Sequence, residues 1–192
     1  MMIQKHSLGY NMSQSHLHAD RKARLFVSIM YTEKSRSFAL EAQNALCMQY
    51  GPVKDIFPEY EFSAYTKYYD AEMQGKVYKQ IVVFERLINP EDIAAIKIYT
   101  NTLEKGFSIN SKRQINLDPG YLTITNVILV STKNFTHRIY LGKGIYAELT
   151  LMFKKDGPQD FAWTYPDFKS ASVKDFLWNE RNVLAEKNKI LK

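Results

Sequence analysis

The side chains best suited to chemistry fall between positions 118 and 148: Asp118, Lys133, His137, Arg138 and Glu148. An arginine presents a planar fork to phosphate or carboxylate, a lysine adds a point charge, and a histidine exchanges a proton near neutral pH. These residue types in one stretch predict a site for a small anionic or phosphorylated metabolite.

If the site is catalytic, each of these residues has an expected role. His137 is the acid or base, and Asp118 or Glu148 orients its ring. Lys133 and Arg138 bind the anion, and Arg138 holds a polarised substrate oxygen. A site of this kind requires all five side chains to converge on one cavity, with Asp118 and His137 within reach of a direct or single-water hydrogen bond.

Three tyrosines are the other expected ligand contacts: Tyr69, Tyr121 and Tyr140. Tyr69 belongs to a tyrosine-rich segment that also contains Asp70 and Glu72. Rings and acids of this kind can line a pocket, or they can pack over an exposed sheet.

Each charged feature also has a purely structural interpretation. The sequence Asp118-Pro119-Gly120 has strong turn chemistry, because proline fixes φ and glycine accepts positive φ, so Asp118 can simply cap a turn. Arg138 can pair with Glu148 across a hairpin, which is a common arrangement.

Several motifs of known chemistry are missing from the sequence. The segment 142–144 lacks the G-x-x-x-x-G-K-[ST] pattern of a P-loop, and there is no G-x-S-x-G nucleophile elbow. Cys47 is the single cysteine, and together with four scattered histidines it gives no zinc-ligand spacing. The sequence therefore assigns no set of metal ligands and no cofactor, although an acid such as Asp118, after a strand, could bind a metal or a substrate.

The composition predicts one globular domain. With 192 residues and 45% hydrophobic content, the chain can bury a core without disulfides or a structural metal. The net charge of +6 permits attraction to phosphates, but there is no aromatic-interleaved basic motif, so nucleic acid is not an expected partner. No run approaches the ~18 apolar residues of a membrane span, so we expect a cytoplasmic protein without membrane contact. No oligomeric state is assigned.

Residues 1–23 are polar, rich in serine and histidine, and without periodicity. We expect a disordered arm there, or sequence upstream of a start at Met12. A single α+β domain then covers residues 24–192.

The first half of that domain predicts the element order βαββαβ. Strands are expected at 25–30, 60–63, 79–85 and 113–117. One helix runs from a cap at Thr32 to the stop at Gly51, and a second runs from a cap at Asn89 to Gly106. This order favours a two-layer sandwich of ferredoxin-like topology, with two helices on one face of a mainly antiparallel sheet.

The second half predicts a β-hairpin and a C-terminal helix. Residues 122–130 fit either a strand or a helix, residues 137–153 alternate as a hairpin, and an amphipathic helix starts at Ser172. We expect a three-residue hairpin loop, 142–144. In that register Leu141 faces Ile145, Tyr140 faces Tyr146 and Arg138 faces Glu148.

Several sequence blocks resemble one known family. They are LFV at 25–27, YTKYYDAEM at 65–73, NPEDIAAIKIYTN at 89–101, NLDPGYLT at 116–123, STK followed by HRIYLGKGIYAELTL at 131–151, and WTYPDFKS at 163–170. In this order they resemble the domain-of-unknown-function 4416 family of small prokaryotic proteins, from about residue 24 to the C-terminus. The resemblance supplies a set of shared residues and no mechanism.

Three functional hypotheses follow from the sequence. The first is an enzyme acting on a small anionic metabolite, and the second is a non-catalytic binding module for a nucleotide or other small ligand. The third is an interaction protein whose polar cluster only stabilises the fold. A pocket reached from solvent would favour the first two hypotheses over the third.

Overall fold

The computed structural model describes residues 22–190. Its strands are β1 (Ala23–Thr32), β2 (Val53–Glu61), β3 (Val77–Ile88), β4 (Ile115–Leu122), β5 (Asn126–Ser131), β6 (Ile139–Gly142), β7 (Ile145–Lys154) and β8 (Gly157–Asp160). Its α-helices are α1 (Arg36–Tyr50), α2 (Ile93–Gly106) and α3 (Ala171–Ile190). Within this range, none of the helices combines the length and the apolar character that crossing a membrane requires.

The disordered arm predicted for residues 1–23 lies outside the described residues, apart from its last two positions. Ala23 is fully buried as the first residue of β1. β1 therefore begins one residue before the predicted boundary of the domain.

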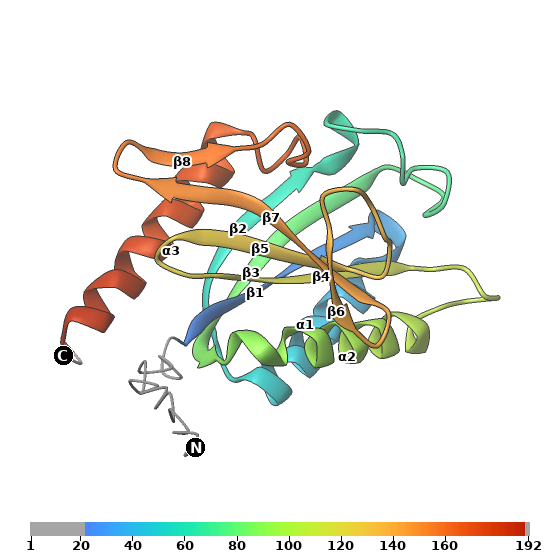
Figure 1. Ribbon diagram of the computed structural model, residues 1–192. Coiled ribbons are helices and arrows are strands. Elements are labelled where there is room, and N and C mark those ends of the chain that lie inside the picture. Colours follow the sequence, from blue (N-terminus) through green and yellow to red (C-terminus); the bar gives the residue numbers. More distant parts are fainter. Residues whose placement is uncertain (1–21, 191–192) are drawn as a thin grey trace, which may run out of the picture.

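All the strands of the described chain form one sheet, in which every neighbouring pair is antiparallel (Figure 1). Their spatial order is β2-β3-β1-β4-β5-β7-β6, and β8 pairs with β7. The α+β class predicted from the sequence is confirmed. The sheet is larger than that of a two-layer ferredoxin-like sandwich, because β5 to β8 continue it beyond β4.

Both faces of the sheet are covered, as β1 shows. Leu25, Val27 and Ile29 belong to the core beneath α1 and α2, whereas Phe26 belongs to the core beneath α3. Every residue of β1 is buried, since helices lie against both of its faces. Figure 1 shows α1 and α2 together on one side of the sheet. The expected two-layer arrangement is therefore wrong, and α3 supplies a third layer.

The predicted turn at Asp118-Pro119-Gly120 lies instead inside β4. Residues 115–122 pair one by one with β1, and the chain turns only at 123–125 before β5. Gly120 is needed here because of space: a Cβ would lie 2.5 Å from the Phe26 ring and 2.6 Å from the Ile128 carbonyl oxygen. Pairing with β1 thus overrides the local turn preference. The ambiguous run 122–130 is the end of β4, this turn and most of β5.

β4 and β5 pair over only three residues each. Gly120–Leu122 faces Val127–Leu129, and no pairing continues from there toward the start of β4. β5 remains paired with β7 as far as Ser131, so it leads away from β4. Pro119, which has no N–H to donate, is the first residue of β4 beyond the pairing. The sheet therefore opens between residues 116–119 and the end of β5.

The hairpin confirms part of the predicted register. Tyr140 faces Tyr146, with ring centres 5.1 Å apart, and Arg138 pairs with Glu148 at 2.8 Å.

The predicted three-residue loop is wrong. Gly142, and not Leu141, faces Ile145, so the loop is Lys143-Gly144. Both loop residues have positive φ, which the two-residue turns that match strand twist require. A register shift between positions 140 and 142 absorbs the extra residue.

Three of the predicted helix boundaries are confirmed, including the end of α2 at Gly106, and one cap is not. Thr32 precedes the 3-10 turn that leads into α1, and Gly51 ends α1. Asn89 precedes a 3-10 turn before α2, but its side chain makes no capping bond. That side chain instead donates to the carboxylate of Asp92.

We predict that Gly120→Ala destabilises the protein by about 1–3 kcal/mol, because a methyl group there overlaps backbone that cannot move aside. Gly106→Ala is the control, since nothing lies within 4 Å of its Cβ position. Urea denaturation of both variants measures the effect, and equal stability of the two would contradict the close approach at Gly120.

Candidate functional site

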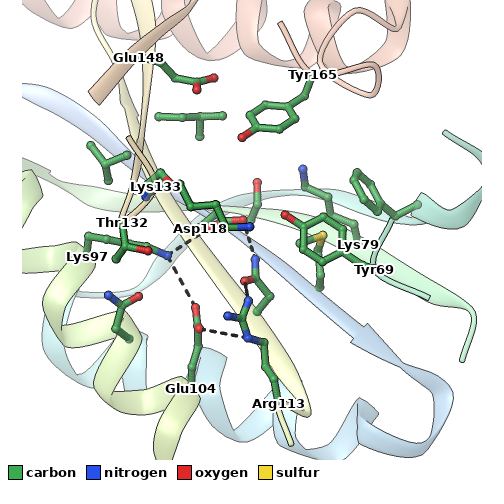
Figure 2. A pocket seen from close by; sticks show the side chains of 18 of the residues that line it. Tyr69, Lys79, Lys97, Glu104, Arg113, Asp118, Thr132, Lys133, Glu148 and Tyr165 are labelled. Carbon is green, nitrogen blue, oxygen red and sulfur yellow. Dashed lines mark hydrogen bonds and ion pairs between the residues drawn. The ribbon is translucent and has the colours of Figure 1, made fainter. Parts of the chain in front are cut away.

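A pocket occupies the opening between β4 and β5 (Figure 2). Its volume is about 110 Å³. Side chains from β1, β3, β4, β5 and β7 line it from the sheet, and α2 together with the segments that follow β2, β5 and β8 and the one that precedes β4 supplies the remaining walls. The charged residues that line it are Lys79, Lys97, Glu104, Arg113, Asp118, Lys133 and Glu148.

Two side chains of α2 bond to the main chain of β4 where β5 has left it. Lys97 Nζ donates to the Leu117 carbonyl oxygen at 2.8 Å, and the Leu117 N–H donates to Glu104 Oε1 at 2.8 Å. Lys97 and Glu104 are seven positions apart, so they lie on one face of the helix about two turns apart. A buried main-chain group without a partner is costly, and these contacts satisfy both groups of Leu117.

Lys97 also lies between two carboxylates, those of Asp118 at 3.1 Å and Glu104 at 3.7 Å (Figure 2). Burial acts to raise the pKa of Asp118, but Lys97, Lys79 and hydrogen bonds outweigh it, and the pKa falls below its ordinary value. For Glu104 burial prevails over Lys97 and raises the pKa. Asp118 is therefore ionised at neutral pH, and 33% of its side-chain surface remains accessible.

Arg113 forms the wall that precedes β4. Its Nε lies 3.3 Å from Glu72 and 3.8 Å from Glu104, and the guanidinium also donates to Asn116. Beside it lies a wider depression of about 580 Å³, which shares Glu104 and Arg113 with the pocket.

Lys79, which lines the pocket from β3, belongs to a buried ion pair. Lys79 Nζ is 2.6 Å from Asp167 Oδ2, and the Tyr60 hydroxyl donates to the same oxygen at 2.7 Å. The ammonium group also lies 5.0 Å from the ring centre of Phe62 and 4.8 Å from that of Phe168. Contacts of this kind hold a buried lysine in one position.

Arg138 does not line the pocket, but it bonds to four residues that do. Its Nε donates to Glu148, its Nη2 to the Tyr165 hydroxyl and its Nη1 to the Lys133 carbonyl, each at 2.8 Å. Its Nη1 also donates to Ser131 Oγ at 3.3 Å. Every nitrogen of the guanidinium is thus engaged, so Arg138 positions the wall and presents no free fork to a ligand.

His137 does not line the pocket, but it contacts Glu148, which does. Its Nε2 is 3.3 Å from Glu148 Oε2, and its ring stacks on Trp163 at 5.2 Å and meets Phe135 at 5.3 Å. Of the two acids predicted to orient it, Glu148 is the one in contact. Asp118 bonds instead to Lys97 and Asn116.

The predicted cluster therefore divides into two connected groups. Asp118, Lys133 and Glu148 line one pocket, whereas His137 and Arg138 contact Glu148 from outside the lining. Across residues 22–190, no three histidine, cysteine, aspartate or glutamate side chains are grouped so as to hold a metal ion.

Of the three predicted tyrosines, Tyr69 alone lines the pocket. Tyr121 packs against the core beneath α1 and α2, and Tyr140 is exposed on β6. Tyr165, which is not among the predicted site residues, also lines the pocket. Burial, aided by the charge of Glu148, raises the pKa of Tyr165 to about 12, so this phenol stays protonated. Burial likewise raises the pKa of Tyr69.

Sequence reasoning missed Lys79, Lys97 and Glu104, although the sequence carries a signal for them. On α2, Lys97 and Glu104 follow Ile93 and Ile96 at helical spacing, so they interrupt the apolar face of an amphipathic helix. On β3, Lys79 lies two positions from each of the buried residues Val77 and Ile81, so it stands on the same face of the strand as they do. A charged residue on a face that must be buried is more informative than an exposed charge, because its burial requires a partner.

Residues 21–183 match the family described as a domain of unknown function (DUF4416). The chain belongs to this family, which confirms the resemblance seen in the sequence. Neither the curated proteins nor the solved structures contain a match to the chain.

We predict that Lys97→Met destabilises the protein by about 3–5 kcal/mol, because it leaves Asp118, Glu104 and the Leu117 carbonyl without their shared cation. Lys105→Met is the control, being an exposed lysine on the same helix. Chemical denaturation compares the two. A loss confined to a few tenths of a kcal/mol in both variants would contradict the bracing role of Lys97.

Glu104→Gln gives a test based on pH. The pKa of Glu104 is raised in the folded state, so folding favours its protonated form, and the contribution of this carboxyl to stability is lost as pH rises from about 4.5 through the folded pKa. Glutamine does not titrate, so the unfolding free energy of the variant relative to wild type should increase over this range. Urea denaturation between pH 4 and 8 measures the difference, and a difference that decreases with pH would show that the pKa is lowered.

Proposed function

We propose that this protein binds a small anionic metabolite in the pocket between β4 and β5. The observation that carries the proposal is the convergence of four cationic side chains from four parts of the chain on one cavity. They are Lys79 on β3, Lys97 on α2, Arg113 before β4 and Lys133 after β5. Cations from separate elements that face one cavity create a local field that attracts an anion.

Lys133 differs from the other three cations in its partners. Lys79, Lys97 and Arg113 each contact a carboxylate. Among the described residues, Lys133 Nζ has no carboxylate within ion-pair distance, and it contacts only the hydroxyl and ring of Tyr68. Its charge is therefore available to an incoming phosphate or carboxylate.

The approach to the pocket is also basic. The adjoining depression is lined by Lys105 and Lys112 as well as Arg113, against Glu72 and Glu104. The whole chain carries a net charge of +6, which adds a weak long-range attraction for anions.

An enzymatic role in the same pocket is the second candidate function. Asp118 is ionised, whereas Tyr69 and Tyr165 are held protonated in the same lining. A proton acceptor and proton donors that face one cavity are the components of acid–base catalysis. Under this hypothesis Glu148, supported by His137 and Arg138, is a further candidate acid or base.

We infer in addition that β1 to β4, with α1 and α2, form a ferredoxin-like unit within the larger sheet. The spatial order β2-β3-β1-β4, with helices after β1 and β3, supports this inference. The single cysteine supports a cytoplasmic location for the protein.

Thermal-shift titration with inorganic phosphate and with succinate tests the proposed function, with sodium chloride at equal ionic strength as the reference. A ligand bound only by the folded state raises the melting temperature with concentration. We expect Lys133→Gln to raise the dissociation constant about tenfold, since a charge-assisted hydrogen bond is lost. Lys155→Gln is the matched control, because it removes the same charge from another exposed loop position.

Two results would contradict the proposal. One is the lack of any shift beyond that of sodium chloride with either anion. The other is an equal response of Lys133→Gln and Lys155→Gln, which would place the bound anion elsewhere on the basic surface.

A further inference from the structure

Ser28 is a buried hydroxyl in the pocket wall that no described residue satisfies. It is 1% exposed, it lines the pocket, and its Oγ has no hydrogen-bond partner. It lies in the middle of β1, whose side chains contribute to the hydrophobic cores on both faces of the sheet. A buried hydroxyl without a partner costs free energy, and native structures seldom contain one without a reason.

The position of Ser28 shows what it can act with. Ser28 pairs directly with Asp118 on β4, so the two side chains stand on the same face of the sheet as nearest cross-strand neighbours. Asp118 accepts hydrogen bonds from Lys97 and Asn116 on different oxygens, and part of its surface is still accessible. A carboxylate oxygen accepts more than one hydrogen bond, so Asp118 can take another donor.

The two side chains together define the group that fits between them. Asp118 is ionised and can only accept, whereas the Ser28 hydroxyl can both donate and accept. A ligand hydroxyl satisfies both residues, because it donates to the carboxylate while its oxygen accepts from Ser28. An ionised carboxylate or an unprotonated phosphate oxygen has no hydrogen to donate, and Asp118 repels it.

The anion and the hydroxyl therefore have separate places in the pocket. Lys133 stands on an exposed loop at the rim, whereas Ser28 and Asp118 stand on the central strands that form the floor. The buried apolar side chains of Met30 and Phe168 also line the pocket.

We infer that Ser28 and Asp118 form a hydroxyl-binding subsite, and that the ligand is a small hydroxylated acid or phosphorylated polyol. The inference rests on the proposed anion site, whose substrate class it narrows. The anionic end of the ligand lies near Lys133, and a hydroxyl group a few bonds away reaches the floor.

Matched ligand pairs test the inference. Malate and succinate differ by one hydroxyl, and glycerol 3-phosphate carries two hydroxyls that n-propyl phosphate lacks. Calorimetric titration should show that the hydroxylated member of each pair binds wild type about five- to tenfold more tightly. Ser28→Ala should abolish this preference while the affinity for succinate and n-propyl phosphate stays unchanged.

Stability provides the second readout. Ser28→Ala removes an unsatisfied group, so its melting temperature should equal or exceed that of wild type in the absence of ligand. Ser28→Cys, which keeps the size and weakens the hydrogen bonding, should reduce the preference in the same direction and guards against a folding defect in the alanine variant.

Three outcomes would overturn the inference, and they differ from a failure of the anion site. Equal affinity of wild type for both members of each pair removes the subsite while leaving the anion site intact. A preference retained by Ser28→Ala assigns the hydroxyl to other residues. A lowered melting temperature of Ser28→Ala with no change in ligand preference shows that Ser28 only holds a water. If wild type binds none of the four compounds, the proposed function fails first.

Discussion

Main-chain N–H and C=O groups in a buried strand need hydrogen-bond partners, and at Leu117 the next strand provides none. The sheet of this protein can open at that position because α2 supplies an ammonium and a carboxylate in place of a strand. Lys97 and Glu104, although they belong to α2, therefore complete the main-chain hydrogen bonding of β4. Gly120 fixes where the opening begins, since its missing side chain lets β5 meet β4 directly before the two strands separate.

The opening between β4 and β5 is also where the pocket forms. Lys97 crosses it and reaches Asp118, which leaves an ionised carboxylate at the base of a cavity that further cations line. The other side of the pocket is fixed by Arg138, whose bonds join the end of β5, the following loop, β7 and Tyr165. Lys97, Glu104 and Arg138 hold the walls, whereas Lys133, Ser28 and the free surface of Asp118 face the space between them.

Hydrophobic periodicity predicts β1, β3 and the helices that end at Gly51 and Gly106, but it places the second strand at 60–63, whereas β2 runs from Val53 to Glu61. It failed at Asp118-Pro119-Gly120, because a local turn preference is weaker than eight consecutive pairings with β1. For the site, counting charges identified Asp118, Lys133 and Glu148, which do share a pocket. Lys79 and Lys97 were missed because they were read as parts of a strand and a helix, although charges on buried faces are the sequence signal for such residues.

Amide hydrogen exchange at Leu117 is the most direct test of this account. If Glu104 replaces a strand, the Leu117 N–H should exchange as slowly as that of Tyr121, which lies where β4 is paired on both sides. Its protection should fall selectively in Glu104→Ala, with Tyr121 little affected. Fast exchange at Leu117 in the unaltered protein, beside slow exchange at Tyr121, would show that α2 does not hold the sheet open and would contradict the account.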